Sequence, residues 1–153
     1  MRFLQKIMFS TLLMVNNCFA IEINDLISVS CHEATNDVAR IGVAIRDEAF
    51  RIKNDKKLSA QQAVVELEKL KGLLGESKGE VFSIVSKDRD KLFRRFGSMF
   101  DVDIYIAIHA QMVTTAFIVA NKYPSSSSDA LTAEINIVCI NKYLESFNKS
   151  KGK

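Results

Sequence analysis

Tryptophan is absent from this sequence, and cysteine, histidine and proline are rare. The two histidines, His32 and His109, are not four residues apart, and neither a CxxC nor an HExxH motif occurs, so no metal site is predicted. No glycine-rich loop is present to hold a phosphate. With no tryptophan and 21 basic against 18 acidic residues, nucleic-acid binding has little support. We therefore expect no cofactor, no metal and no nucleic-acid partner.

The sequence also offers few groups for nucleophilic catalysis. Cys31 and His109 could form a nucleophile–base pair, but such a pair needs a reduced thiol. Asp101 and Asp103 are two positions apart and do not share a helix face, so we expect them to complement the dipole at a helix start. We expect His109 to be a satisfied core histidine and His32 to be solvated. The sequence therefore favours a protein that is not an enzyme.

The first twenty residues have the pattern of a secretory signal peptide. Arg2 and Lys6 form a positive head, an apolar run of nine residues follows, and small residues stand at Cys18 and Ala20. We expect cleavage after Ala20. One alternative is an uncleaved anchor, although nine apolar residues are fewer than the roughly twenty that a membrane-spanning helix needs. The other alternative is a lipoprotein acylated at Cys18.

A signal peptide would direct the protein to the periplasm or out of the cell, and residues 1–20 would then be removed. This removal would leave 19 basic against 18 acidic residues, no membrane span and two cysteines, Cys31 and Cys139. In an oxidising compartment, an even number of cysteines favours a disulfide. We expect these two to be bonded, closing a loop of about a hundred residues between the start and the end of the fold.

Apolar spacing predicts two amphipathic helices in the first half of the chain. Asn24 or Asp25 is expected to cap the first. Its apolar stripe consists of Ile27, Cys31, Ala34, Val38, Ile41, Ile45, Ala49 and Ile52. The second is expected to start at Ser59, which forms a capping box with Gln62, and to stop at Gly75. Its buried stripe consists of Ala60, Ala63, Val64, Leu67, Leu70 and Leu74.

After a polar connection at 75–80, a third helix is predicted over about 80–96. The stretch "SKDRDK" at 86–91 interrupts its apolar pattern and could break it into two shorter helices. The segment 102–123 is the most apolar of the chain after the leader, and its two apolar faces predict a central helix. The alternating, β-branched residues 102–109 make a strand the alternative there.

The single proline begins the low-complexity run "PSSSSD" at 124–129, which predicts a loop with Ser127 or Ser128 as the cap of a last helix over about 129–148. The main stripe of that helix is expected to be Ala133, Ile137, Ile140, Leu144 and Phe147, with Cys139 at its flank. Residues 149–153 are expected to form a disordered basic tail. Together these segments predict an all-α bundle of about five helices in one domain, residues 21–148.

A cysteine in the first helix, within "LISVSCHEA", and a second in a late helix, within "INIVCINKYLES", give a resemblance to a known family. In these two stretches the chain resembles the helical periplasmic immunity proteins that neutralise type VI secretion amidase effectors. The resemblance implies that the partner is a peptidoglycan amidase, which a loop of the immunity protein blocks.

These patterns predict a small exported protein that binds another protein and inhibits or protects it. A homodimer is a further possible assembly. The alternatives are a periplasmic stress chaperone and a component of the envelope or of a secretion apparatus. Two polar connections, 75–80 and 124–129, are long enough to protrude into a partner. The partner-binding candidates in them are Glu76, Lys78, Glu80, Ser125, Ser126, Ser127 and Asp129.

Overall fold

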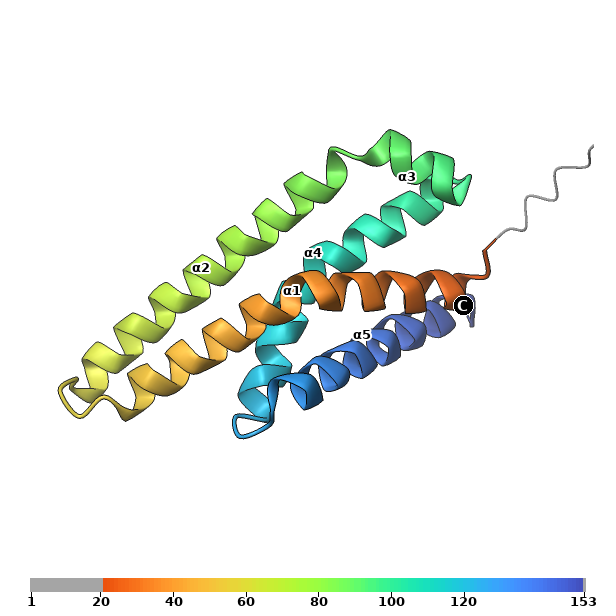
Figure 1. Cartoon of the computed structure of the whole chain (residues 1–153). Helices are drawn as coiled ribbons and strands as arrows, with labels where there is room; N and C mark the ends of the chain where they lie inside the picture. Colours follow the sequence, from red (N-terminus) through yellow and green to blue (C-terminus); the bar gives the residue numbers. More distant parts are fainter. Residues whose placement is uncertain (1–20, 153) are drawn as a thin grey trace, which may run out of the picture.

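The computed structural model describes residues 21–152, so the expected signal peptide and Cys18 lie outside the described residues. The described chain forms five α-helices and no strand, which confirms the all-α prediction. The helices are α1 (Ile23–Asn54), α2 (Ala60–Ser86), α3 (Arg89–Phe96), α4 (Met99–Lys122) and α5 (Ser128–Lys151). Figure 1 shows α1 and α2 as a long antiparallel hairpin, with α4 crossing behind α1 and α5 lying alongside it.

The predicted stripe of α1 is confirmed. All of its members are buried except Ile41, which is half-buried, and they pack mainly on α4 and α5. The predicted cap is wrong, because the helix begins before Asn24 and Asp25, after an N-terminal Glu22 that makes no side-chain cap bond. Ile23 explains the earlier start, since it packs against two of the core clusters and is drawn into the first turn.

The capping box of Ser59 and Gln62 is confirmed at the start of α2, but the stop at Gly75 is wrong. The helix continues through residues 75–80 to Ser86 and breaks at Lys87 and Asp88, within the stretch that offered a break. Glycine ends a helix when it takes a left-handed conformation, and Gly75 does not. A β-carbon at Gly75 would meet nothing within 4 Å, while half-buried neighbours such as Leu74 hold the helix to the core.

Helix α4 is the central helix of the bundle, so the helical prediction for 102–123 is confirmed and the strand alternative for 102–109 is wrong. Half of its residues are buried, and it contacts each of the other four helices. Among the described residues, α4 is the one helix long and apolar enough to cross a membrane, and most of that stretch is buried inside the bundle.

The cap at Ser127 is confirmed, since its hydroxyl accepts from the N–H of Ala130 at 3.3 Å. The predicted stripe of α5 is wrong in its first half, where Leu131, Ile135 and Cys139 are buried and Ile137 is 51% exposed. The half-cystine is the reason, because Cys139 has to face Cys31 and so sets the rotation of α5. Cys139, predicted at the flank of the stripe, therefore lies on the buried face. The second half of the stripe is confirmed in part, since Ile140, Leu144 and Phe147 are half-buried against the main core.

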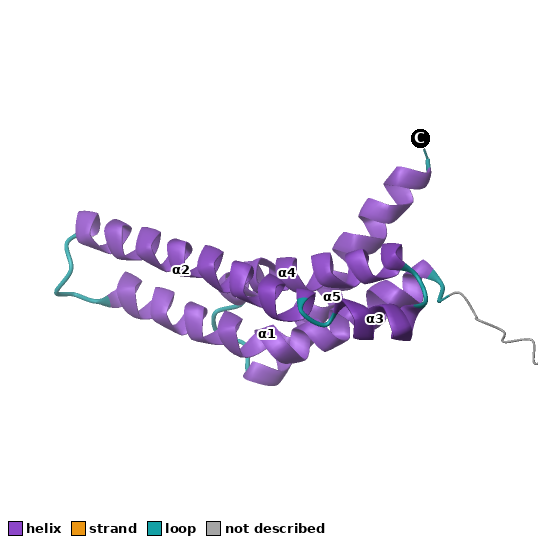
Figure 2. Cartoon of the chain, turned by 90° about the horizontal axis from the view of Figure 1, so that it is seen from above, coloured by secondary structure: helices purple, strands orange, loops and turns teal. Residues whose placement is uncertain are grey.

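Helix α5 also includes residues 149–151, which were expected to be disordered. Lys149 and Lys151 lie in its last turn, where positive side chains stabilise the negative end of the helix dipole. Figure 2 shows the last turns of α5 extending beyond the other helices.

The disulfide between Cys31 and Cys139 is confirmed, with a Cα–Cα distance of 5.8 Å. Both residues are fully buried in the main core cluster, which α1, α4 and α5 build together. The bridge therefore joins the first and last helices from inside the core.

Candidate functional site

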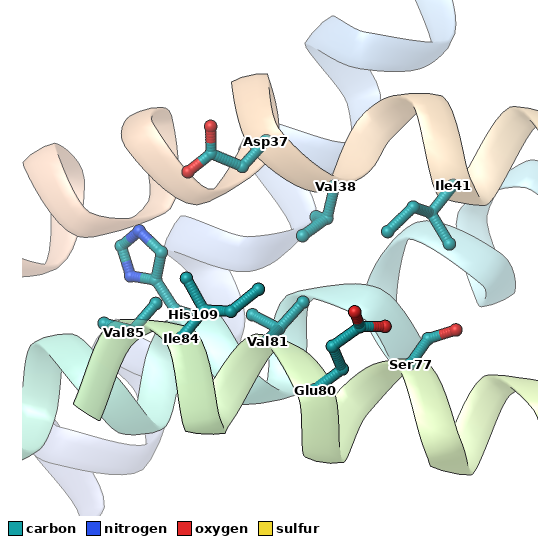
Figure 3. A pocket seen from close by; sticks show the side chains of 9 residues that line it. All are labelled: Asp37, Val38, Ile41, Ser77, Glu80, Val81, Ile84, Val85 and His109. Carbon is teal, nitrogen blue, oxygen red and sulfur yellow. The ribbon is translucent and has the colours of Figure 1, made fainter. Parts of the chain in front are cut away.

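A groove runs between α1 and α2, with α4 as its floor, and has a volume of about 450 Å³. Figure 3 shows the side chains that line it. We call it the α1–α2 groove and define it by Asp37, Val38 and Ile41 of α1, Ser77, Glu80, Val81, Ile84 and Val85 of α2, and His109 of α4.

The groove exists because α1 and α2 are packed together only near the turn that joins them. There, Ile45, Ala49 and Ile52 of α1 form a buried cluster with Leu70. Leu70 is also the one residue of α2 that is buried. Beyond it α2 rests more on α4 than on α1, so the two helices part and their facing side chains line an open space.

A second hollow of about 330 Å³ continues the groove towards α3. It shares four lining residues with the groove, among them Asp37 and His109. Its other lining residues include two bases, Lys91 and Arg95. Asp88 also lines this hollow, so acidic side chains border the whole depression, whereas the bases that line it belong to α3 and lie only at that end.

His109 lies at the floor of the groove and is 1% exposed. Its Nδ1 is 2.9 Å from the backbone oxygen of Tyr105, and because a carbonyl oxygen only accepts, Nδ1 carries the proton. Nε2 is then an acceptor, and no described residue donates to it. Burial lowers the pKa of His109, which keeps the ring neutral near pH 7.

An ion-pair cluster beside the groove holds His109 in place. Arg95 of α3 donates to both carboxylate oxygens of Glu33 of α1, at 2.6 and 3.1 Å, and the hydroxyl of Tyr105 donates to Glu33 at 2.7 Å. The hydrogen bond from Arg95 lowers the pKa of Glu33, and burial raises the pKa of Tyr105. Since Tyr105 also accepts from His109 and its ring lies 4.1 Å from the imidazole, the cluster fixes the floor of the groove.

The groove offers apolar walls and unpaired acceptors. Ser77, a wall residue, donates its hydroxyl to the carbonyl of Leu73 at 2.9 Å, so it is not bonded to His109. The carboxylates of Asp37 and Glu80 form no ion pair or hydrogen bond with another residue of the described range, 21–152. This arrangement can hold a ligand that combines an aliphatic part with N–H donors.

The structure separates the partner-binding candidates that the sequence suggested. Glu76, Lys78 and Glu80 are helical residues of α2 rather than loop residues, because the helix does not stop at Gly75. Of these three, Glu80 lines the α1–α2 groove, while Lys78 lines a different hollow beside Phe82.

The second group lies at the connection between α4 and α5. Ser125 and Ser126 are in the loop, Ser127 caps α5, and Asp129 is in its first turn. Arg46 of α1 donates to the carbonyl of Ser126 at 3.2 Å, which ties the loop down. None of the four lines the α1–α2 groove, and their role in binding stays a prediction.

His32, Asp101 and Asp103 lie outside the α1–α2 groove. His32 is exposed, as expected. Asp101 is in the first turn of α4, as expected, and its N–H donates to the hydroxyl of Ser98. Asp103 instead pairs with Arg89 at 2.6 Å. Within residues 21–152, no three His, Cys, Asp or Glu side chains are grouped so as to hold a metal ion.

Sequence reasoning missed Asp37 and the role of His109. Asp37 is an exposed residue of α1 that borders the groove, and it was not among the candidate residues. A histidine inside the most apolar helix was the available signal, because a buried imidazole needs partners for both nitrogens and here one lacks a partner. Comparisons of the chain with protein-family models, with curated proteins and with solved structures found no match.

Proposed function

We propose that this protein is an exported binding protein that attaches to one other protein and inhibits or protects it, using the α1–α2 groove. The observation that carries the proposal is an apolar groove whose floor contains an unpaired acceptor, Nε2 of His109. A buried polar atom without a partner costs about 1–3 kcal/mol, and a ligand that donates to it recovers that free energy.

The bundle around the groove suits a binding role outside the cytoplasm. Its disulfide is formed between buried residues, which fits an oxidising compartment such as the periplasm, and the first twenty residues have the pattern of an export signal. An intact-mass measurement of protein from the periplasm tests this location. A mass that starts at Ile21 is expected, and a mass that retains residues 1–20 would contradict export with cleavage.

A narrower form of the proposal is an immunity protein against an effector that degrades the cell wall. Its support is the resemblance of the two cysteine-containing helical stretches to that family. In this form the partner is an exported amidase, and the purified protein is expected to abolish the activity of that amidase at equimolar concentration.

A stress chaperone is the second candidate, and the surface of α2 is the observation that favours it. Five large apolar side chains of this helix are about half-exposed or more, namely Val64, Val65, Leu73, Phe82 and Ile84. Such exposed apolar surface often marks an interaction site. A chaperone would bind many unfolded clients through this surface, whereas the proposed binder selects one folded partner.

Affinity capture from a periplasmic extract, followed by mass spectrometry and calorimetry with the identified partner, distinguishes the two. We use Ile84→Lys as the groove variant and Ile118→Lys of α4 as its matched control, because these residues are 58% and 57% exposed and only Ile84 lines the groove. One partner is expected, with affinity reduced more than tenfold, about 1.4 kcal/mol, by Ile84→Lys and unchanged by the control.

Two results would overturn this proposal. Suppression of aggregation of many unrelated acid-unfolded proteins, without capture of a single partner, would replace it with the chaperone. A partner that Ile84→Lys leaves bound, but that Ser125→Ala weakens more than tenfold, would move the site to the loop between α4 and α5.

A further inference from the structure

We infer that the α1–α2 groove receives an arginine side chain of the partner, with the guanidinium held by Asp37 and Nε2 of His109, and with Glu80 attracting it at the other end of the groove. This inference rests on the proposed function, because it states which chemical group of the bound protein enters the groove.

Charge is the first support. The charged residues that line the groove are Asp37 and Glu80, one on each wall, and both are exposed. Figure 3 shows the two carboxylates coming from α1 and α2 respectively. By contrast, other acidic side chains, such as Glu33 and Glu48, are neutralised by arginines of the same chain. A cationic group is therefore the complement of this groove.

His109 is the second support, and it is independent of the acidic side chains. Its ring comes up from α4 towards the side of the groove where Asp37 lies (Figure 3), and it is 1% exposed. Since Nδ1 donates to Tyr105, the unpartnered Nε2 can only accept. Ile84 lies beside the ring (Figure 3), borders the groove and is 58% exposed, so we assign to it the movement that would open Nε2 to a donor.

The apolar walls favour arginine over lysine. Val38, Val81 and Val85 can cover an aliphatic stem, which long basic side chains bury while their charged end stays with polar partners. A guanidinium carries five N–H donors in a plane and is more weakly hydrated than an ammonium, so it loses less on entering a half-closed groove. Acceptors on two different helices, Asp37 of α1 and His109 of α4, suit a group with several donors better than one compact charge.

The direction of entry follows from the hollow next to the groove. Lys91 and Arg95 line that hollow, and Arg95 is already paired with Glu33. Although Asp88 lines that hollow too, the two bases make the α3 end less favourable for a guanidinium than the other end, where no base is among the lining residues. The arginine therefore enters from the end of the groove where Ser77 and Glu80 lie.

The inference is tested with small probes on purified, disulfide-intact protein, by NMR at pH 7.5. The probes are n-butylguanidinium, n-butylammonium and butyrate, which share a short alkyl chain and differ in the head group. With n-butylguanidinium we expect saturable shifts of the His109 Nε2 nitrogen and of the Ile84 methyl groups. Binding of n-butylammonium is expected to be several-fold weaker, and butyrate is expected to cause no shift at these positions.

Variants assign the three acceptors. Asp37→Asn and Glu80→Gln are expected to weaken n-butylguanidinium binding at least threefold each. His109→Asn removes Nε2 but keeps an amide that can donate to the carbonyl four residues earlier, as Asn54 and Asn121 do in this chain at 2.7 and 2.9 Å. It is expected to abolish the preference for guanidinium over ammonium. Glu76→Gln, an exposed neighbour on α2 outside the groove, is the control that leaves binding unchanged.

The absence of a saturable shift, or a shift that Asp37→Asn and Glu80→Gln leave unaltered, would overturn the arginine assignment, and so would equal binding of the two cations. A captured partner that Ile84→Lys releases, but that the acceptor variants still bind as tightly as the unaltered protein does, would overturn this inference and leave the proposed function standing. Conversely, failure to capture any partner would overturn the proposed function, whereas saturable guanidinium binding would still support the chemistry assigned to the groove.

Discussion

A β-carbon placed on Gly42 of α1 would lie 2.7 Å from the β-carbon of Ala116 in α4. The backbone carbon and oxygen of Ala116 would lie 3.1 Å away, so a small movement of one side chain could not relieve the overlap. Glycine at this position lets the two helices come this close. Gly42 follows Val38 by about one turn and Ala116 follows His109 by about two, so the contact sets the distance between one wall of the groove and its floor.

We predict that Gly42→Ala destabilises the protein by about 1–3 kcal/mol, because overpacking forces the helices apart. Gly72→Ala is the matched control, since a β-carbon there meets nothing within 4 Å. In that exposed helical position alanine should raise the free energy of unfolding by about 0.4–1 kcal/mol. Urea unfolding of the two variants measures both changes. Equal stability of Gly42→Ala and the unaltered protein would contradict the close contact.

The same residue type shows why part of the fold could not be predicted from the sequence. Gly75 and Gly97 both follow apolar helical patterns, but only Gly97 adopts a positive φ, 74°, and ends a helix. Gly75 remains helical because the tertiary contacts of its neighbours on α2, such as Leu74, outweigh the local cost of glycine. The local sequence around Gly75 does not show these tertiary contacts, so it predicted a helix end that does not occur. The first helix was predictable because its stripe is long and regular.

The groove was not predictable for a related reason. Its walls belong to α1 and α2, and the distance between these helices depends on how α2 packs on α4. No local sequence pattern specifies that packing. The rotation of α5 was mispredicted because the sequence places Ile137 and Cys139 on competing faces. The pairing of the cysteines was predicted correctly. The prediction for α5 did not take into account that this pairing turns Cys139 towards α1.

The disulfide is predicted to contribute about 4–5 kcal/mol, because it closes a loop with a sequence separation of 108 and restricts the unfolded chain. Both half-cystines are fully buried, so Cys31→Ser and Cys139→Ser should cost similar amounts. Thermal unfolding with and without reductant measures the contribution, and identical Tm values would contradict it.

Glu33 is predicted to make stability sensitive to strong acid. Its pKa is lowered in the folded state by Arg95, so its ionised form stabilises the fold above the ordinary pKa of a glutamate, about 4.3. That contribution is lost as the pH falls through the folded-state value. Glu33→Gln should lower stability by about 0.5–1 kcal/mol at pH 7, because both partners are partly exposed, and should flatten the decline below pH 4.5. Glu48→Gln, at a more exposed pair, should change little.

Those measurements are urea titrations at pH 7, 4 and 3. A variant whose stability falls as steeply in acid as that of the unaltered protein would show that Glu33 is not the responsible group. Tyr105→Phe separates the two donors, since it removes the hydroxyl that donates to Glu33 at 2.7 Å and leaves Arg95 in place.

His109 is predicted to make stability fall with decreasing pH, as Glu33 does, but at a higher pH. Burial lowers its pKa, so between its ordinary value of about 6.5 and the lower folded value the unfolded chain binds more protons than the folded one. Stability should therefore fall as the pH drops below about 6.5. His109→Asn should reduce this slope between pH 7.5 and 5, whereas His32→Asn, at an exposed position, should leave it unchanged.

The same protonation turns Nε2 from an acceptor into a donor, so guanidinium binding in the groove should weaken over the same range. Asp37 and Glu33 favour the protonated ring and Arg95 opposes it, and burial, the largest influence, favours the neutral form. The other charged side chains that line the same two hollows are Glu80, Asp88 and Lys91. Urea titrations and n-butylguanidinium titrations at pH 7.5 and 5.5 test the two effects together. If stability and binding both stay constant across that range while the ring nitrogens are seen to protonate, His109 is not the acceptor at the groove floor.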